Sequence, residues 1–177
     1  NPDGPVRALA VSAGILHVGG DFTIIGGQAR SRLAALVAGH GGLTSWSPTA
    51  NGQVFALSSA GGRVFAGGGF GIAGGVARNR LAAVTLGSGV AFAMNPNVNG
   101  DVLALAFSGN TLYFGGAFTT VSGGPKNRAG AWDITIGLQP WHPDLNGTVR
   151  ALAVSGSTVY LGGDFSFANA GAAGRKA

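Results

Sequence analysis

The stretch VGGDFTIIGGQARSRLAAL, residues 18–36, decides the fold because the chain repeats it. Two glycine pairs and two arginines stand between apolar runs. The same phrase returns as AGGGFGIAGGVARNRLAAV (66–84), FGGAFTTVSGGPKNRAGAW (114–132) and, shortened, LGGDFSFANAGAAGRKA (161–177). A dinucleotide-binding loop is excluded, because that fingerprint leads from a strand into a helix, and here a second strand pattern follows. The phrase is therefore a unit of a repeat protein.

The period of this repeat is about 48 residues. An apolar run opens each unit, at Val6, Val54, Val102 and Val149. The phenylalanines after the glycine pairs keep the same spacings of 48, 48 and 47: Phe22, Phe70, Phe118 and Phe165. The second copy divides at its turn residues into four strand-like segments, 54–59, 63–70, 80–86 and 90–94. Four antiparallel strands at this period are typical of a β-propeller blade, whereas the coils of a β-solenoid, the main alternative, are shorter.

The sequence therefore predicts an all-β protein, a β-propeller of four-stranded blades. About 3.7 blades are expected, with boundaries near residues 1–50, 51–98, 99–145 and 146–177. The innermost strands are expected at residues 6–12, 54–59, 102–108 and 149–155. Because an open row of blades leaves sheet faces and edges unpaired, we expect the stretch to be part of a larger propeller or to close with another chain.

Composition fits a turn-rich β protein. Of the 177 residues, 34 are glycine, but they follow no three-residue period, which excludes collagen. The hydrophobic share of 46% is enough for a buried core. The absence of cysteine excludes disulfides, thiolate zinc sites and a cysteine nucleophile. No apolar run reaches the roughly 18 residues that a spanning helix needs, so no membrane span is expected.

The repeat also carries a family resemblance. Its parts, NG-x-V-x-A-L-A, then V-Y-L-G-G-D-F, then G-G-Q-A-R-S-R-L-A-A-L and W-x-P, span essentially the whole chain. This unit resembles the short bacterial propeller repeats grouped as a domain of unknown function in large secreted or surface proteins. It is also similar to the repeats of fungal cortical polarity-marker proteins. The resemblance implies a propeller fold and an extracellular or cell-surface location, and it assigns no activity.

A second resemblance concerns the end of each unit. AWDITIGLQPW, residues 131–141, is similar to the girdle motif of quinoprotein dehydrogenase propellers, in which a tryptophan docks on the neighbouring blade. The other copies depart from it, since Val37 and Thr85 replace the aspartate and Met94 stands in place of the tryptophan. We therefore expect Trp46 and Trp141 to be structural residues at blade interfaces.

The basic residues form two series in the loop between the second and third strands. The first lies ten residues after each phenylalanine, at Arg32, Arg80, Arg128 and Arg175. Because its spacing is constant, we expect it to be buried and bonded to carbonyls, an aspartate or a tryptophan face. The second lies two residues earlier, at Arg30, Arg78 and Lys126, and Ala173 breaks it. This tolerance predicts exposure on one rim, a binding surface for an anionic polysaccharide or a protein.

Catalysis and nucleic-acid binding are disfavoured. His17, His40 and His142 share no repeat position, so they indicate neither a metal site nor a catalytic set, and no cofactor is expected. The aromatic residues lie in strands and not in the basic loops, which argues against base stacking. The favoured function is a non-enzymatic scaffold or adhesion module. The alternatives are a quinoprotein-like or glycan-processing enzyme and a structural repeat of a filament, sheath or virion surface.

Overall fold

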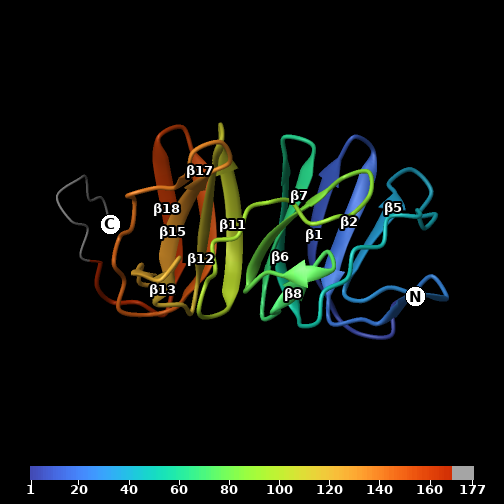
Figure 1. Ribbon diagram of the computed structural model, residues 1–177, viewed down its shortest axis with the longest axis horizontal. Helices are drawn as coiled ribbons and strands as arrows, with labels where there is room; N and C mark the ends of the chain where they lie inside the picture. The colour runs from blue at the N-terminus through green and yellow to red at the C-terminus, as the bar shows by residue number, and fades with distance from the viewer. Residues whose placement is uncertain (169–177) are drawn as a thin grey trace.

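The structure is a computed structural model that describes residues 1–168. These residues form strands, turns and loops, and no helix occurs among them, so the predicted all-β class is confirmed. Apart from three separate two-stranded hairpins, the strands form four successive antiparallel sheets, which we number in chain order (Figure 1). Sheet 1 contains β1 (Val6–Ser12), β2 (Ile15–Gly20) and β5 (Leu33–Val37). Sheet 2 contains β6 (Val54–Ala60), β7 (Arg63–Gly68) and β10 (Leu81–Thr85).

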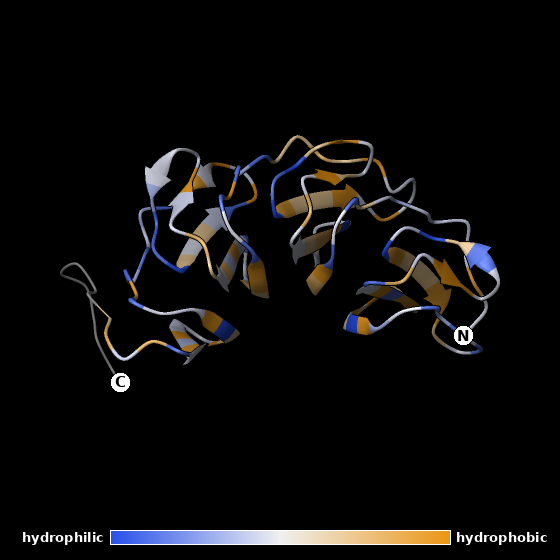
Figure 2. Ribbon diagram, turned by 90° about the horizontal axis from the view of Figure 1, so that it is seen from below, coloured by the Kyte–Doolittle hydropathy of each residue, from blue (hydrophilic) through white to orange (hydrophobic). Residues whose placement is uncertain are grey.

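Sheets 3 and 4 continue the pattern. Sheet 3 contains β11 (Val102–Ser108), β12 (Thr111–Gly116), β15 (Ala129–Asp133) and β16 (Gly137–Leu138). The described part of sheet 4 consists of β17 (Val149–Ser155) and β18 (Thr158–Gly163). The first strand of each sheet agrees closely with the predicted innermost strand, and these first strands lie next to one another from sheet to sheet. Figure 2 shows the sheets fanned along an open arc, as propeller blades are.

In sheets 1 to 3 a short hairpin interrupts the connection between the second and third strands, which the sequence did not indicate. The three hairpins are β3–β4 (Ile24–Ile25 and Gln28–Ala29), β8–β9 (Ile72–Ala73 and Val76–Ala77) and β13–β14 (Thr120–Val121 and Gly124–Pro125). The linkers to sheets 2 and 3 meet the hairpins of those sheets, as in the bridge Ala50–Ala73 and the bond from the Ser122 N–H to the Pro96 carbonyl. The linker to sheet 4 forms the bridge Leu145–Ala168. Hairpins and linkers therefore share one edge of the molecule, which we call the loop face.

The predicted fourth strands are much shorter than expected. Among residues 1–168 a fourth strand occurs in sheet 3 alone, β16, while in sheets 1 and 2 a single bridge stands in its place, Leu36–Leu43 and Val84–Ala91. The prediction of a strand over residues 90–94 is therefore wrong. Phe92 donates one backbone hydrogen bond to Ala83, and the chain then leaves the sheet so that the buried Met94 packs into the core between sheets 2 and 3.

The glycine pairs are explained by two close approaches. A Cβ atom on Gly67 would stand 2.7 Å from a methyl group of Val102 in the next sheet. A Cβ on Gly68 would collide with the backbone carbonyl of Gln53, beside the bulge at the start of β6. The first glycine therefore lets the sheets meet, and the second lets the first strand bend.

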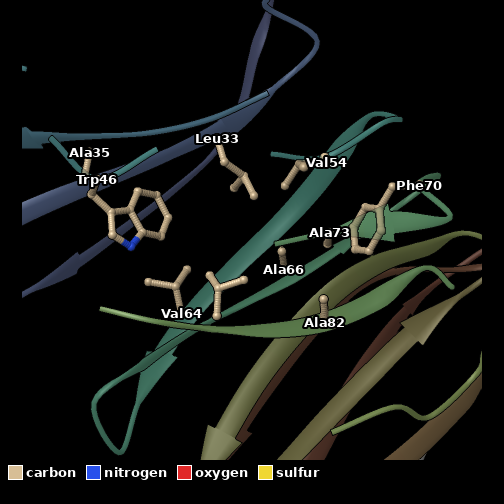
Figure 3. Close-up of a cluster of buried hydrophobic side chains, with 11 residues drawn as sticks. Leu33, Ala35, Trp46, Val54, Val64, Ala66, Phe70, Ala73 and Ala82 are labelled. Atoms are coloured by element: carbon tan, nitrogen blue, oxygen red, sulfur yellow. The ribbon is translucent and has the colours of Figure 1, made fainter. Parts of the chain in front are cut away.

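The core lies between the sheets. Along β7, Val64 and Ala66 belong to the cluster shared with sheet 1, whereas Phe65 belongs to the cluster shared with sheet 3. Figure 3 shows the first of these clusters, in which Trp46 of sheet 1 faces Val64 of sheet 2. Because alternate side chains of a strand point to opposite faces, an internal sheet buries both of its faces.

Candidate functional site

The loop face is the candidate functional surface, and its geometry begins with the arginines that follow each phenylalanine by ten residues. Arg32, Arg80 and Arg128 have left-handed backbones, with φ of 66°, 65° and 68°. The N–H of each donates to the carbonyl of the phenylalanine ten residues before it, at 2.9 to 3.0 Å. The carbonyl of each accepts from the second glycine of the pair. These two bonds close the loop that carries the hairpin. The constant spacing of ten residues between phenylalanine and arginine is therefore set by backbone hydrogen bonds.

The side chains of this series are half-buried and not fully buried as expected. Arg32 donates from Nη1 to the carbonyl of Ala50 in the linker to sheet 2, at 2.9 Å. Arg80 instead donates to Gly69 and Phe70 of its own sheet, at 2.8 and 3.0 Å, and its Nε lies 3.6 Å from Asp101. Arg128 donates to Ala117 at 2.6 Å. The expected carbonyl partners are present, and Arg175 lies outside the described residues.

The expected exposure of Arg30, Arg78 and Lys126 is corrected by the structure. Lys126 is buried, and the two arginines are half-buried. Arg30 donates to the carbonyl of Thr44 and Arg78 to that of Phe92, while Lys126 donates to Gln139 and Pro140, all between 3.0 and 3.1 Å. These carbonyls lie just after the single bridge in sheets 1 and 2 and just after β16 in sheet 3, so the cations hold the outer edges of sheets 1 to 3. Their role in binding a polyanion stays a prediction.

A third series, which the sequence reasoning missed, fixes the loop face. The side-chain oxygen of Asn51 accepts from the N–H groups of Gly71 and Ile72, at 2.8 and 2.9 Å. Equivalent oxygens of Asp3, Asn99 and Asn146 accept from two successive N–H groups in the same way. The recurring Asn-Gly pair, with Asp-Gly in the first copy, was the available signal in the sequence. In Asp3, bonds from the Thr23 hydroxyl and from the Ile24 and Thr23 N–H groups lower the carboxyl pKa from 3.8 to about 2.

The tryptophans differ in burial. Trp46 is buried, its Nε1 donates to the carbonyl of Thr85 in sheet 2 at 2.9 Å, and its ring meets His17 edge-on. Burial lowers the pKa of His17. Trp141 is half-buried and meets Tyr113 edge-on. The phenylalanines follow the same trend, because Phe22, Phe70 and Phe118 are fully buried while Phe165 is only partly buried.

Two aspartates of the repeat pair with arginines of the first strands. Asp21 accepts two hydrogen bonds from Arg7, at 2.6 and 2.7 Å, and Asp164 accepts two from Arg150, at 2.7 and 2.8 Å. These bonds lower the pKa of both carboxyls. Within residues 1–168 no three His, Cys, Asp or Glu side chains gather closely enough to hold a metal ion.

A polar hollow of about 320 Å³ opens on the loop face at the junction of sheets 2 and 3. Its walls come from three segments that are distant in sequence. Asn79 and Arg80 follow the β8–β9 hairpin, Asn97 and Asn99 belong to the linker, and Thr120 lies in β13. Its lining of amides, a hydroxyl and a guanidinium is suited to hydrogen bonding with a polar ligand.

Comparison with known proteins identifies the fold and no function. No protein-family model and no curated protein matches the chain. The structure is similar to that of the computationally designed Ika4 protein, with 21% identity and a TM-score of 0.66 over 92% of this chain and 88% of that one. It is also similar to the designed Ika8 protein, with 19% identity and a TM-score of 0.51 over 89% of this chain and 55% of that one.

BamB from Moraxella catarrhalis gives 18% identity and a TM-score of 0.54, over 95% of this chain and 51% of that one. The matched proteins include natural and designed β-propellers, so the sheets of this chain form a propeller-like fold. The part of the chain that the structure describes contains no helix long and apolar enough to cross a membrane.

Proposed function

We propose that this chain is a non-enzymatic β-propeller scaffold or adhesion module of an extracellular or cell-surface protein, and that its loop face binds an anionic glycan or a protein. The observation that supports this most is the polar hollow at the junction of sheets 2 and 3, which Arg80 lines. A net charge of +5 favours an anionic partner. The recurring hydrogen bonds described above give the loop face fixed geometry, as recognition surfaces need.

The binding proposal is tested by presenting a sulfated polysaccharide, polygalacturonate and neutral dextran to the immobilised chain. We expect the two polyanions to bind and the dextran not to bind. Binding should weaken between about 50 and 500 mM salt, because screening and counterion release act on charged contacts. Equal responses to dextran and to the polyanions would contradict the proposal. No response at all would leave the scaffold role alone, and cleavage of a polymer would favour the enzyme alternative.

We also propose that further sheets of the same repeat close the propeller, from the same protein or from a second copy. In β6, Val54 and Leu57 pack into the core shared with sheet 1, and Val54 is fully buried. Val6 and Leu9 hold the same repeat positions in β1 but are 42% and 58% exposed. At the other end, Tyr160 holds the position of His17 and is 58% exposed. Each end of the arc therefore presents one half of the interface that the internal sheets form.

Sedimentation velocity tests this closure. The chain should self-associate through its two ends, and Leu9→Asp should shift it to monomer, because a charge would enter the apolar contact. The matched change Ile136→Asp, at a highly exposed residue in the turn between β15 and β16, should have no effect. A chain that stays monomeric up to its solubility limit would contradict the proposal that its end faces require partners.

A further inference from the structure

The hollow at the junction of sheets 2 and 3 is held in shape by its own hydrogen bonds. Asn79 donates from Nδ2 to Oδ1 of Asn97 at 2.6 Å. Asn99 accepts from the N–H groups of Thr119 and Thr120, both at 2.9 Å, and donates to the Thr119 hydroxyl. Amide side chains fixed in this way lose little conformational entropy when they meet a ligand.

Three polar groups of the hollow have no hydrogen-bond partner among the described residues. Asn79 has its Oδ1 acceptor free, Asn97 has its Nδ2 donor free, and Arg80 has the donors of Nη2 free, since Nη1 holds the two carbonyls. Nε of Arg80 is buried without a hydrogen bond and lies 3.6 Å from a carboxylate oxygen of Asp101, so Nη2 is the edge left for a ligand. An acceptor and a donor side by side match the hydroxyls of a sugar, and a guanidinium edge matches a carboxylate.

The two sister junctions differ from this one at the same repeat positions. At the junction of sheets 1 and 2 the amides are replaced by Ser31 and Thr49, and Arg32 reaches across to the linker carbonyl of Ala50. At the junction of sheets 3 and 4 the position of Asn97 is taken by Asp144, which accepts a hydrogen bond from Asn127. The first junction therefore has a guanidinium crossing it, and the last carries a carboxylate at the position of Asn97. The middle junction also has a carboxylate, Asp101, but it lies beside Nε of Arg80 and is not among the residues that line the hollow.

We propose that the hollow lined by Asn79, Arg80 and Asn97 is a binding site for one uronic-acid unit of a glycan. The sugar hydroxyls bond to the two amides, and the sugar carboxylate bonds to Nη2 of Arg80. This assignment rests on the proposed binding of anionic glycans by the loop face, and it gives that binding one site and one ligand class.

The test is titration calorimetry with a galacturonic-acid trimer and with the same trimer after its carboxyls are reduced to alcohols. Asn97→Asp is the informative variant, because Asp144 already occupies this repeat position with a similar backbone, φ 52° against 48° for Asn97. We expect Asn97→Asp to weaken binding of the acidic trimer by about tenfold or more, since it places like charges together. Thr49→Asp is the matched control, because it adds the same charge to the same face at another junction, and it should leave affinity within about twofold.

Each other outcome separates the site from the general proposal. Equal losses in Asn97→Asp and Thr49→Asp would mean diffuse charge attraction, which overturns the site and keeps polyanion binding by the loop face. Equal affinity for the acidic and the reduced trimers would overturn the role of Arg80 in reading a carboxylate. If the long polymer binds and the trimer does not, the hollow is not a one-unit site. Thermal unfolding of both variants verifies that they fold.

Discussion

The junction of sheets 1 and 2 and the junction of sheets 3 and 4 are built from the same repeat but are completed to different degrees. In the first, Trp46 lies in a closed cluster with Leu33, Val54 and Val64, and its indole N–H is satisfied by Thr85. In the second, Trp141 packs at the edge of a smaller cluster, where the described part of sheet 4 is a two-stranded hairpin.

This difference shows that the repeat does not stabilise itself within one unit. At the first junction the third strand of the next sheet, β10, lies opposite the tryptophan and supplies the Thr85 carbonyl to its indole N–H. Stability is therefore a property of neighbouring pairs of sheets, as in other repeat proteins.

The largest effect should separate the two tryptophans. Trp46→Ala is expected to lower the free energy of unfolding by about 3–5 kcal/mol, the range for deleting a large buried aromatic. Trp141→Ala should cost only about 1–2 kcal/mol, because its ring is half-exposed and loses fewer contacts. Denaturant unfolding of both variants measures this difference. Equal losses in the free energy of unfolding would contradict the conclusion that the two junctions differ in completeness.

The next effect concerns the cations that hold the outer edges of the sheets. Lys126→Gln should destabilise the fold by about 1–3 kcal/mol, because it removes charged hydrogen bonds to the carbonyls of Gln139 and Pro140 in a buried setting. An exposed lysine on a basic rim would give a change within about 0.5 kcal/mol. Urea unfolding of the variant and of the original chain at neutral pH distinguishes the two.

A smaller effect is expected from His17, which should make the stability of the junction between sheets 1 and 2 depend on pH. Burial lowers the pKa of His17 from its ordinary value of 6.5, so the unfolded chain binds the proton more readily than the folded one. The contribution of neutral, buried His17 to the free energy of unfolding is therefore complete above pH 6.5 and declines as the pH falls below that value. His17→Phe should remove this slope, since Phe65 holds the same position in sheet 2. Melting temperatures across this range measure it, and an unchanged slope would exclude His17 as its source.

The smallest effect is expected at Asp3, on the exposed first loop. Its lowered pKa, about 2 against 3.8, means that its hydrogen bonds stabilise the fold above pH 3.8 and are lost as the pH falls towards 2. Asp3→Asn keeps the acceptor that Asn51 and Asn99 use and should flatten the acid part of the unfolding curve. Asp21 and Asp164 keep their own slopes in this variant. A variant with the same acid sensitivity as the original chain would count against the role of Asp3.

Much of the fold can be predicted from the sequence because each strand pattern and turn pattern occurs in several copies of the repeat. The first strands and the glycine pairs recur three or four times, so their positions are predicted closely. The fourth strands were overestimated because an apolar run such as 90–94 looks like a strand, while Met94 in fact leaves the sheet to pack on its neighbour. The hairpins were missed because strands of two residues have no periodicity to detect.

The roles of the two basic series could not be predicted from spacing. Constant spacing correctly indicated a constraint at Arg32, but the constraint acts on the left-handed backbone and leaves the side chain half-exposed. The break at Ala173 suggested exposure of the other series, whereas Lys126 is buried over the carbonyls of residues 139 and 140. Which carbonyls lack a partner depends on where the fourth strand ends, and that is set by packing between sheets.

The dependence of each sheet on its neighbours is tested most directly by native-state hydrogen exchange, resolved by strand. Sheet 2 is packed on both faces, so the amides of β6 and β7 should exchange slowest, near the limit set by global unfolding. The amides of β17 and β18 should exchange faster, although their ladder has the same register as that of β6 and β7. Equal protection in the two hairpins, or greater protection in β17 and β18, would contradict the conclusion that stability comes from contacts between sheets.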